Sequence, residues 1–188
     1  MTFTLFSSPT YCLTEPTQGH VLIGPPASGK STAAQHLSFR LSAAVVSTDD
    51  LRQELWGDPS IQGPWPELER LFHQRINVAI QRHGRVIVDA THARPHWRRR
   101  LIHAFEPGQP LIWCGWWLQT PLETCLRWNQ WRCRRVPDEV IERFHAALAH
   151  PDSAPRKEEG FHQLHRLDPS RGDLTEQIDK AIPHREES

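Results

Sequence analysis

The pattern of apolar and polar positions alternates along the chain between short apolar runs and segments with helical spacing. Short apolar runs predict β-strands at His20–Ile23, Ala43–Ser47, Arg85–Asp89, Leu111–Leu118 and Phe161–Leu167. Between these runs, apolar residues recur every three or four positions, as is typical of amphipathic helices. Strands that alternate with helices predict an α/β fold whose parallel sheet is covered on both faces.

Prolines mark several of the predicted helix starts. The first helical position tolerates proline because its N–H would have no partner there. Pro66, Pro95, Pro121 and Pro137 are expected at that position. Thr120 stands three residues before Glu123, which is the spacing of a capping box.

Three regions follow from these patterns. Residues 1–18 are rich in Ser, Thr and Pro and are expected to form a loosely held N-terminal arm. Residues 19–168 are expected to form one α/β domain, because no repeat or clear linker interrupts them. Residues 169–188 are expected to form a helical tail, with Leu174, Ile178 and Ile182 spaced to pack on the domain.

Amino-acid composition and net charge limit the location and the binding partners that we expect for the chain. The formal net charge is 0, so no broad cationic surface indicates nucleic acid. The four cysteines form no C-x-x-C pair, and reduced thiols are expected. The first residues do not resemble a signal peptide, and the longest apolar run, Leu111–Leu118, is too short to span a bilayer. We therefore expect a cytoplasmic protein with no membrane partner.

The most specific motif is a complete G-x-x-x-x-G-K-[ST] phosphate-binding loop. It lies between a predicted strand and a predicted helix and comprises Gly24, Pro25, Pro26, Ala27, Ser28, Gly29, Lys30 and Ser31, with Thr32 next. Backbone N–H groups of such a loop converge on the phosphates of a nucleotide, helped by the positive end of the helix. Lys30 is expected to reach the β- and γ-phosphates, and the Ser31 hydroxyl to bind Mg²⁺.

The second predicted strand ends in Ser47-Thr48-Asp49-Asp50-Leu51-Arg52. The carboxyl ends of parallel strands line the ligand crevice of an open sheet. A carboxylate at Asp49 can accept a proton from an attacking hydroxyl, and Arg52, one turn later, can hold an anionic part of the acceptor. The alternative is a structural role, with Asp49 as a helix N-cap and Arg52 in solvent.

Two further features suit phosphoryl transfer. The apolar strand Val86-Ile87-Val88 ends in Asp89, which is placed to hold Mg²⁺ or to bond Ser31, although it could instead cap a turn. Four arginines precede Val136-Pro137, namely Arg127, Arg132, Arg134 and Arg135. Arginines on a closing lid can stabilise charge in the transition state, and of the four we choose Arg132. The alternative is a solvated basic helix end, and a solvated face is also expected for Arg94, Arg98, Arg99 and Arg100.

These motifs in this order resemble the kinase domain of polynucleotide 5′-hydroxyl kinases and the AAA-domain ATP-binding proteins grouped with them. The likeness covers about residues 20–167 and rests on GPPASGKST, STDDLRQELWGD, GRVIVDATHARPHWRRRLI and WLQTPLETCLRWNQWRCRRVPDEVI. The resemblance implies that Asp49 is the general base, that Arg52 contacts the acceptor's phosphate, and that Arg132 is the lid arginine. It also implies that Asp89 is the strand aspartate of the family.

The residues and the resemblance together predict a P-loop NTPase fold of the kinase type. We expect a three-layer sandwich whose five-stranded parallel sheet has the order 2-3-1-4-5, with an Arg-rich lid. The expected function is transfer of the γ-phosphoryl group from ATP, with Mg²⁺, to a hydroxyl acceptor. A polynucleotide or nucleotide 5′-hydroxyl is favoured, with single-stranded nucleic acid among the partners. A metabolite kinase and a non-catalytic ATP-binding switch remain as alternatives, and the oligomeric state is left open.

Overall fold

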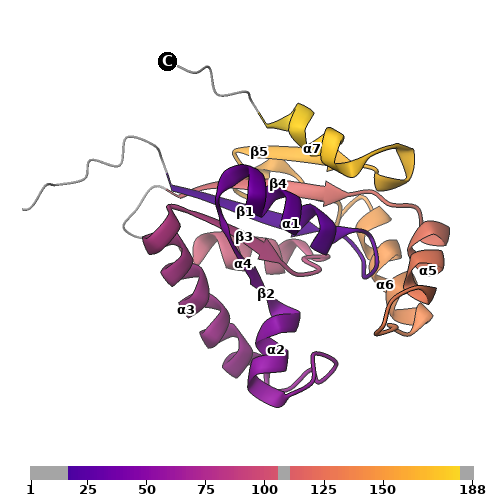
Figure 1. Cartoon of the computed structure of the whole chain (residues 1–188), viewed down its shortest axis with the longest axis horizontal. Helices are drawn as coiled ribbons and strands as arrows, with labels where there is room; N and C mark the ends of the chain where they lie inside the picture. The colour runs from indigo at the N-terminus through magenta and orange to yellow at the C-terminus, as the bar shows by residue number, and fades with distance from the viewer. Residues whose placement is uncertain (1–16, 106–110, 183–188) are drawn as a thin grey trace, which may run out of the picture.

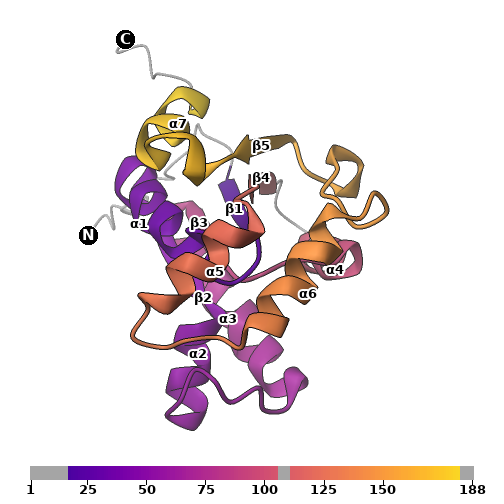
Figure 2. The same ribbon diagram turned by 90° about the vertical axis from the view of Figure 1, so that its right-hand side faces the viewer.

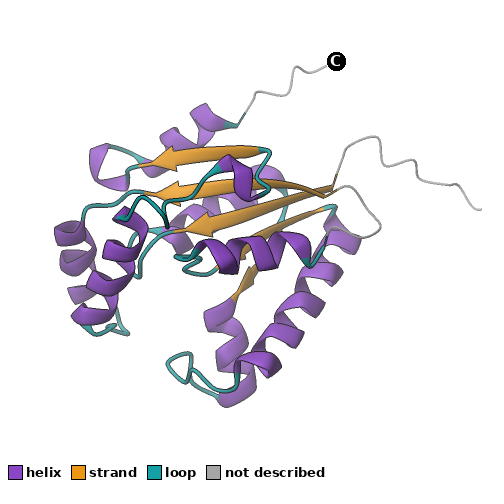
Figure 3. Cartoon of the chain, turned by 180° about the vertical axis from the view of Figure 1, so that it is seen from behind, coloured by secondary structure: helices purple, strands orange, loops and turns teal. Residues whose placement is uncertain are grey.

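A computed structural model describes residues 17–105 and 111–182 of the chain. The described residues include a parallel sheet of five strands, drawn as arrows in Figure 3. The strands are β1 (Thr17–Ile23), β2 (Ala44–Ser47), β3 (Arg85–Asp89), β4 (Leu111–Leu118) and β5 (Gln163–Leu167). Their order is β2-β3-β1-β4-β5, which confirms the predicted order 2-3-1-4-5.

Helices connect the strands, as the alternating pattern predicts. The α-helices are α1 (Lys30–Leu41), α2 (Thr48–Trp56), α3 (Trp65–His83), α4 (Pro95–His103), α5 (Leu122–Gln130), α6 (Asp138–Ala149) and α7 (Leu174–Ala181). Two short 3-10 helices are η1 (Lys157–Glu159) and η2 (Pro169–Arg171). Within the described ranges, no helix is both long and apolar enough to pass through a membrane.

The helices form a layer on each face of the sheet (Figure 1). On one face, α1 and α7 pack over Leu22, Ile87 and Trp116. On the other face, α3, α4 and part of α6 pack over Val21, Val88 and neighbouring residues. Both faces of the sheet are therefore buried, which explains why its central strands read as nearly continuous apolar runs.

The parallel register brings the carboxyl ends of the strands to one edge of the sheet, where α5 and α6 lie (Figure 3). Val21 of β1 lies beside Val88 of β3, and Ser47 of β2 lies beside Asp89 of β3. The P-loop after β1, the start of α2 and the end of β3 therefore meet at this edge.

Several boundaries differ from the sequence prediction, and β2 begins one residue late, at Ala44 rather than Ala43. β1 begins at Thr17, so the last residues assigned to the N-terminal arm belong to the sheet, while residues 1–16 of that arm lie outside the described residues. β5 begins at Gln163 rather than at Phe161, whose ring instead fills the core beside α4 and β4. The predicted tail contains α7, in which Leu174 and Ile178 are buried, and residues 183–188 lie outside the described part of the chain.

The helix starts are also shifted at three of the four prolines. Only Pro95 is the first residue of its helix, whereas Pro66 is the second residue of α3. Pro121 and Pro137 are N-caps, because their ψ angles of 146° and 136° are extended rather than helical. The capping box predicted at Thr120 is wrong for the same reason. The helix starts one residue too late for it, and the Thr120 hydroxyl donates to Ser28 O at 2.8 Å.

Arg98 is buried, so the solvated position predicted for it is wrong. Its guanidinium bonds both carboxylate oxygens of Glu159, and it also donates to Ser153 O at 2.9 Å and to His92 O at 2.8 Å. A buried guanidinium needs such partners, because an unpaired charge in the interior is costly. The ion pair joins α4, η1 and the turn at His92.

Candidate active site

The P-loop between β1 and α1 has the backbone shape that its glycines allow. Ala27 and Gly29 have φ angles of 60° and 94°, in the left-handed region. A Cβ atom at Gly24 would lie only 2.6 Å from Ser28 Oγ, so glycine is required where the chain turns. Gly24 N donates to Thr91 O at 3.2 Å, which ties the start of the loop to the segment after β3.

The loop ends at an open helix N-terminus. Gly29 is the N-cap of α1, and no side chain in the described residues caps this helix. Among the same residues, the buried Ser28 Oγ has no hydrogen-bond partner. The free N–H groups of the first turn and the helix dipole attract anions, so the loop fits the phosphates of a nucleotide.

Lys30 is the cation of this loop. Its side chain is buried, and Nζ donates to Pro25 O at 2.6 Å. Burial lowers the pKa of the Lys30 ammonium, and the negative charge of Asp89 opposes that shift most strongly. A buried ammonium gains from an anionic ligand, because burial disfavours its charge.

Ser31 and Asp89 bring a hydroxyl and a carboxylate together near Lys30. Ser31 Oγ donates to Asp89 Oδ2 at 3.0 Å, as predicted from the two motifs. Burial raises the pKa of Asp89, while Lys30 and the bond from Ser31 hold that pKa down. A hydroxyl and a carboxylate are hard oxygen donors of the kind that Mg²⁺ prefers, so these residues fit the metal. We call the P-loop, Lys30, Ser31 and Asp89 the donor half of the site.

Asp49 lies at the start of α2, directly after β2. The N-cap of this helix is Ser47, whose Oγ accepts from Asp49 N at 3.2 Å and from Asp50 N at 3.4 Å. The alternative role of Asp49 as N-cap is therefore wrong. Its carboxylate bonds two guanidinium groups instead, Arg52 Nη1 at 3.0 Å and Arg134 Nη1 at 3.2 Å. We call Asp49 and Arg52 the acceptor half.

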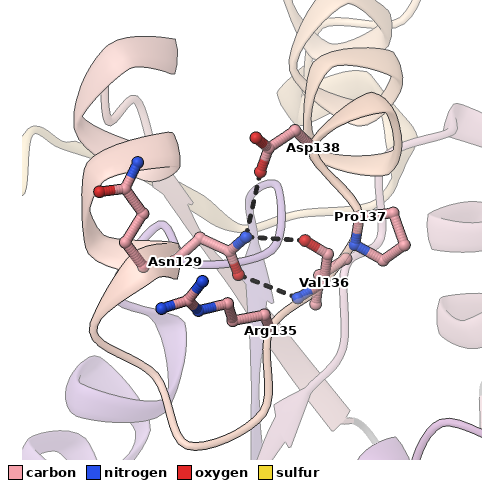
Figure 4. A pocket seen from close by; sticks show the side chains of 6 residues that line it. Asn129, Arg135, Val136, Pro137 and Asp138 are labelled. Atoms are coloured by element: carbon pink, nitrogen blue, oxygen red, sulfur yellow. Dashed lines mark hydrogen bonds between the residues drawn. The ribbon is translucent and has the colours of Figure 1, made fainter.

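The lid loop, residues 131–137, connects α5 to α6 and runs past α2 (Figure 2). Asn129 pins its base, because Nδ2 donates to Val136 O at 2.7 Å and to Asp138 Oδ1 at 3.2 Å. The Asn129 Oδ1 atom accepts from Val136 N at 3.0 Å. Figure 4 shows these bonds beside an open pocket of about 520 Å³, into which the Arg135 side chain also reaches.

The lid loop brings arginines to both halves of the site. The positive charge of Arg132 lowers the pKa of Lys30 in the donor half. Arg134 contacts Asp49 in the acceptor half. The sequence motif indicated Arg132, but it did not indicate the partner of Arg134 or the bonds of Asn129, because both depend on how the loop folds back. The polar Asn129 at a position that the helical period buries was the available signal.

His92 contacts the strand that leads into the P-loop, a contact that the sequence pattern did not indicate. Its φ angle is 45°, its side chain is buried, and its Nδ1 lies 3.1 Å from Leu22 O. Arg98 bonds the His92 carbonyl from the other side. The turn at His92 therefore connects the buried Arg98–Glu159 ion pair to the strand that leads into the P-loop.

The sheet order, the loop after β1 and the helices on both faces define a P-loop fold of the kinase type. The chain belongs to the AAA domain family, whose model matches residues 20–151. No curated protein matches the chain significantly. A fold of this family implies that the chain binds a nucleotide such as ATP.

Several solved structures share the fold. A chain of the Pnkp1/Rnl/Hen1 RNA repair complex is 21% identical with a TM-score of 0.60, over 75% of this chain and 47% of that one. This chain thus spans about half the length of that relative. A gluconokinase from Sinorhizobium meliloti 1021 is 17% identical with a TM-score of 0.59, over 88% and 90% of the two chains. A sugar kinase from Janibacter sp. is 20% identical with a TM-score of 0.60, over 88% and 92%.

Proposed function

We propose that this protein is an ATP- and Mg²⁺-dependent kinase that transfers the γ-phosphoryl group to a hydroxyl acceptor. The proposal rests on one observation: the donor half and the acceptor half lie together at the carboxyl ends of the strands. Lys30, Ser31 and Asp89 form a phosphate and metal site, and the Asp49 carboxylate stands on the neighbouring helix with a guanidinium beside it.

The proposed reaction assigns one task to each group. The acceptor hydroxyl loses its proton to Asp49 while its oxygen forms a bond to the γ-phosphorus. The bond from that phosphorus to the β–γ bridging oxygen breaks, and ADP leaves. Lys30 binds the β- and γ-phosphates, and Arg132 stabilises the charge that develops during transfer.

The metal and the nucleotide have defined places in this proposal. Ser31 and Asp89 would hold Mg²⁺, which supplies neutralising charge to the phosphates when bound. The remaining P-loop positions, from Gly24 to Gly29, and Thr32 would contact the phosphates chiefly through backbone N–H groups. Arg52 would hold an anionic group of the acceptor.

A polynucleotide or nucleotide 5′-hydroxyl is the favoured acceptor. Support comes from the order of the four motifs and from the likeness to a chain of an RNA repair complex. A metabolite kinase is the second candidate, because the gluconokinase and the sugar kinase match over nearly their whole length. The net charge of 0 also suits a small acceptor as well as a nucleic acid.

The direct test is transfer from labelled ATP to a panel of acceptors. The panel holds 5′-hydroxyl RNA and DNA oligonucleotides, nucleoside 3′-phosphates and sugar acids. We expect label on the nucleic acids or nucleotides, and label on sugar acids alone would favour the metabolite kinase. ATP binding with no transfer to any acceptor would contradict the kinase proposal and favour a switch.

A substitution of Asp49 tests its role as the base, and the same substitution of the next residue, Asp50, is the matched control. Asp49→Asn is expected to lower kcat about 100-fold or more, because it removes the proton acceptor, while ATP binding stays unchanged because the P-loop and Lys30 remain intact. Asp50→Asn removes the same charge from the same helical turn, yet it leaves in place the carboxylate that Arg52 and Arg134 bond, which is that of Asp49. Equal activity of the two variants would show that Asp49 is not the base.

A further inference from the structure

Thr120 lies between β4 and α5 and contacts the P-loop, although the proposed reaction gives it no task. Its side chain is buried, and its hydroxyl donates to Ser28 O at 2.8 Å, across 92 residues of the chain. The Thr120 carbonyl accepts from Cys125 Sγ of α5 at 3.7 Å. Thr120 therefore joins the P-loop to the first turns of the helix that leads into the lid loop.

The end of β4 also supports the P-loop through apolar contacts. A Cβ atom at Gly24 would lie 3.3 Å from Leu118 Cβ, and one at Gly29 would lie 3.6 Å from Leu118 Cδ2. Dispersion contacts of this kind set how closely the loop approaches the strand, but they do not fix the direction in which a peptide unit faces. A hydrogen bond is directional, so the Thr120 hydroxyl fixes the direction of the Ser28 carbonyl.

The direction of this carbonyl sets the direction of the next N–H group. Ser28 O and Gly29 N belong to one peptide unit, and the described residues contain no cis peptide bond. In a trans unit, the C=O and N–H groups point in opposite directions. Because the Ser28 carbonyl faces Thr120, the Gly29 N–H faces away from it. Within residues 17–105 and 111–182, Gly29 N donates to no other group.

The backbone around Ser28 has the form of an anion-binding turn. Ala27 and Gly29 have left-handed φ angles on either side of Ser28, whose own φ angle is not positive. Alternation of this kind gathers successive N–H groups into a concavity that binds anions. The Gly29 N–H is thus one of the groups that the loop presents to phosphates, next to the free N–H groups of the first turn of α1.

This backbone shape needs support when no nucleotide holds it. The left-handed φ of Ala27 is unfavourable, because it brings Cβ close to a carbonyl oxygen. Ser28 is fully buried, so its carbonyl needs a donor where it stands. Without the Thr120 hydroxyl, the peptide unit between Ser28 and Gly29 is free to rotate and to turn the Gly29 N–H away. A nucleotide would then have to restore the orientation, at a loss of affinity.

We propose that Thr120 is a positioning residue of the donor half: its hydroxyl holds the Ser28–Gly29 peptide unit so that the Gly29 N–H faces the phosphates of the nucleotide. This inference rests on the proposed function and concerns its nucleotide-binding step alone. Thr120 acts through Ser28, and it has no task at the reacting atoms.

The test removes the hydroxyl and keeps the shape of the side chain. Thr120→Val replaces the hydroxyl with a methyl group, whereas Thr120→Ser keeps the hydroxyl and removes the methyl group. Thr124→Val is the matched control, because Thr124 is a second buried threonine, four residues later in α5. Calorimetric titration with ADP, and separately with tripolyphosphate, measures phosphate binding in each protein in the presence of Mg²⁺.

In Thr120→Val, the dissociation constants of ADP and of tripolyphosphate are both expected to rise about tenfold, as for the loss of a buried hydrogen bond whose acceptor stays unpaired. Thr120→Ser should recover most of the affinity, and Thr124→Val should bind both ligands as the wild type does. Unchanged binding in Thr120→Val, or an equal loss in Thr124→Val, would overturn the inference. A loss for ADP alone would also overturn it, because the contact would then serve the nucleoside and not the phosphates.

Turnover distinguishes a positioning role from a catalytic one. With an acceptor that the wild type phosphorylates, Thr120→Val should raise the KM for ATP about tenfold and leave kcat and the acceptor KM nearly unchanged, because the lost interaction holds the nucleotide equally before and during transfer. A fall in kcat with an unchanged KM for ATP would contradict the positioning role. If the wild type phosphorylates no acceptor, the proposed function fails, and the two titrations still decide the role of Thr120.

Thr120→Ala repeats the titrations in case the valine does not fit. Circular dichroism spectra and the Tm of each variant show whether it is folded at the temperature of the titrations. Loss of the native fold in both Thr120→Val and Thr120→Ala would assign the contact to the stability of the whole domain, and it would overturn the inference.

Discussion

Burial gives His92 a pKa far from that of an ordinary histidine. Its Nδ1 lies near Leu22 O of β1, and burial lowers the pKa of its ring from 6.5 to about 4. In the unfolded chain the ring takes up a proton near pH 6.5, whereas the folded chain resists protonation until about pH 4. The stability that this residue contributes is therefore complete above pH 6.5 and is lost as the pH falls toward 4.

We expect the free energy of unfolding to fall by up to about 3 kcal/mol through His92 between pH 7 and pH 4, since each pKa unit is worth about 1.4 kcal/mol. Urea unfolding at a series of pH values measures this slope. His92→Asn should reduce the slope, and it should not abolish it, because burial also lowers the pKa of His20 to about 4. A variant with the wild-type slope would contradict this prediction.

The Arg98–Glu159 pair shows why single residues could not all be placed from the sequence. Arg94, Arg98, Arg99 and Arg100 look alike in sequence, but Arg98 alone of these four is buried, and its carboxylate partner Glu159 lies 61 residues away in the chain. Arg100 bonds Glu69 from an exposed position. Since removal of one partner leaves a buried charge unpaired, Arg98→Met or Glu159→Gln should destabilise the protein by about 3–5 kcal/mol.

The double variant Arg98→Met/Glu159→Met checks that explanation by urea unfolding. It leaves no buried charge, so it should be more stable than either single variant. Losses that simply add in the double variant would mean that packing, and not the charge pair, accounts for the single losses.

At the scale of elements, the strands and helices were largely predictable from the sequence. The first residues of the helices and the path of the lid loop were less predictable. Apolar runs located the strands because the sheet is buried on both faces, and helical periods located α3, α6 and α7. The N-cap positions of Pro121 and Pro137 were missed, because the fixed φ of proline suits an N-cap as well as a first helical residue. The path of the lid loop depends on three bonds of one asparagine, which no periodicity encodes.

Asn129 should therefore control the order of the lid loop. Asn129→Ala leaves Val136 N and O without their partner, and it should increase the rate of tryptic cleavage at the lid arginines about tenfold. Cleavage is followed under native conditions by mass spectrometry. Gln130→Ala, the exposed neighbour on the same helix, is the control, and equal cleavage of both variants would rule out a pinning role.

At the scale of the whole molecule, the sheet order was predictable because the P-loop motif and the later motifs resemble one family in a fixed order. The donor half was predictable for the same reason: the Ser31–Asp89 contact joins two motifs across neighbouring parallel strands. The contact between Arg134 and Asp49 was not, since it spans 85 residues and no periodicity relates the two segments that it joins.

Because the nucleotide would bind only the folded chain, ATP with Mg²⁺ should stabilise the whole molecule. At 100 times the dissociation constant, linkage adds about 2.7 kcal/mol, which corresponds to an increase in Tm of about 5–10 °C for a chain of this size. Scanning calorimetry with and without ATP measures the increase, and chelation of Mg²⁺ should reduce it. Lys30→Ala should abolish the increase, because it removes the buried ammonium that favours the phosphates. Asp49→Asn should keep the full increase in Tm, because Asp49 belongs to the acceptor half. An equal loss of the increase in both variants would mean that nucleotide binding depends on both halves.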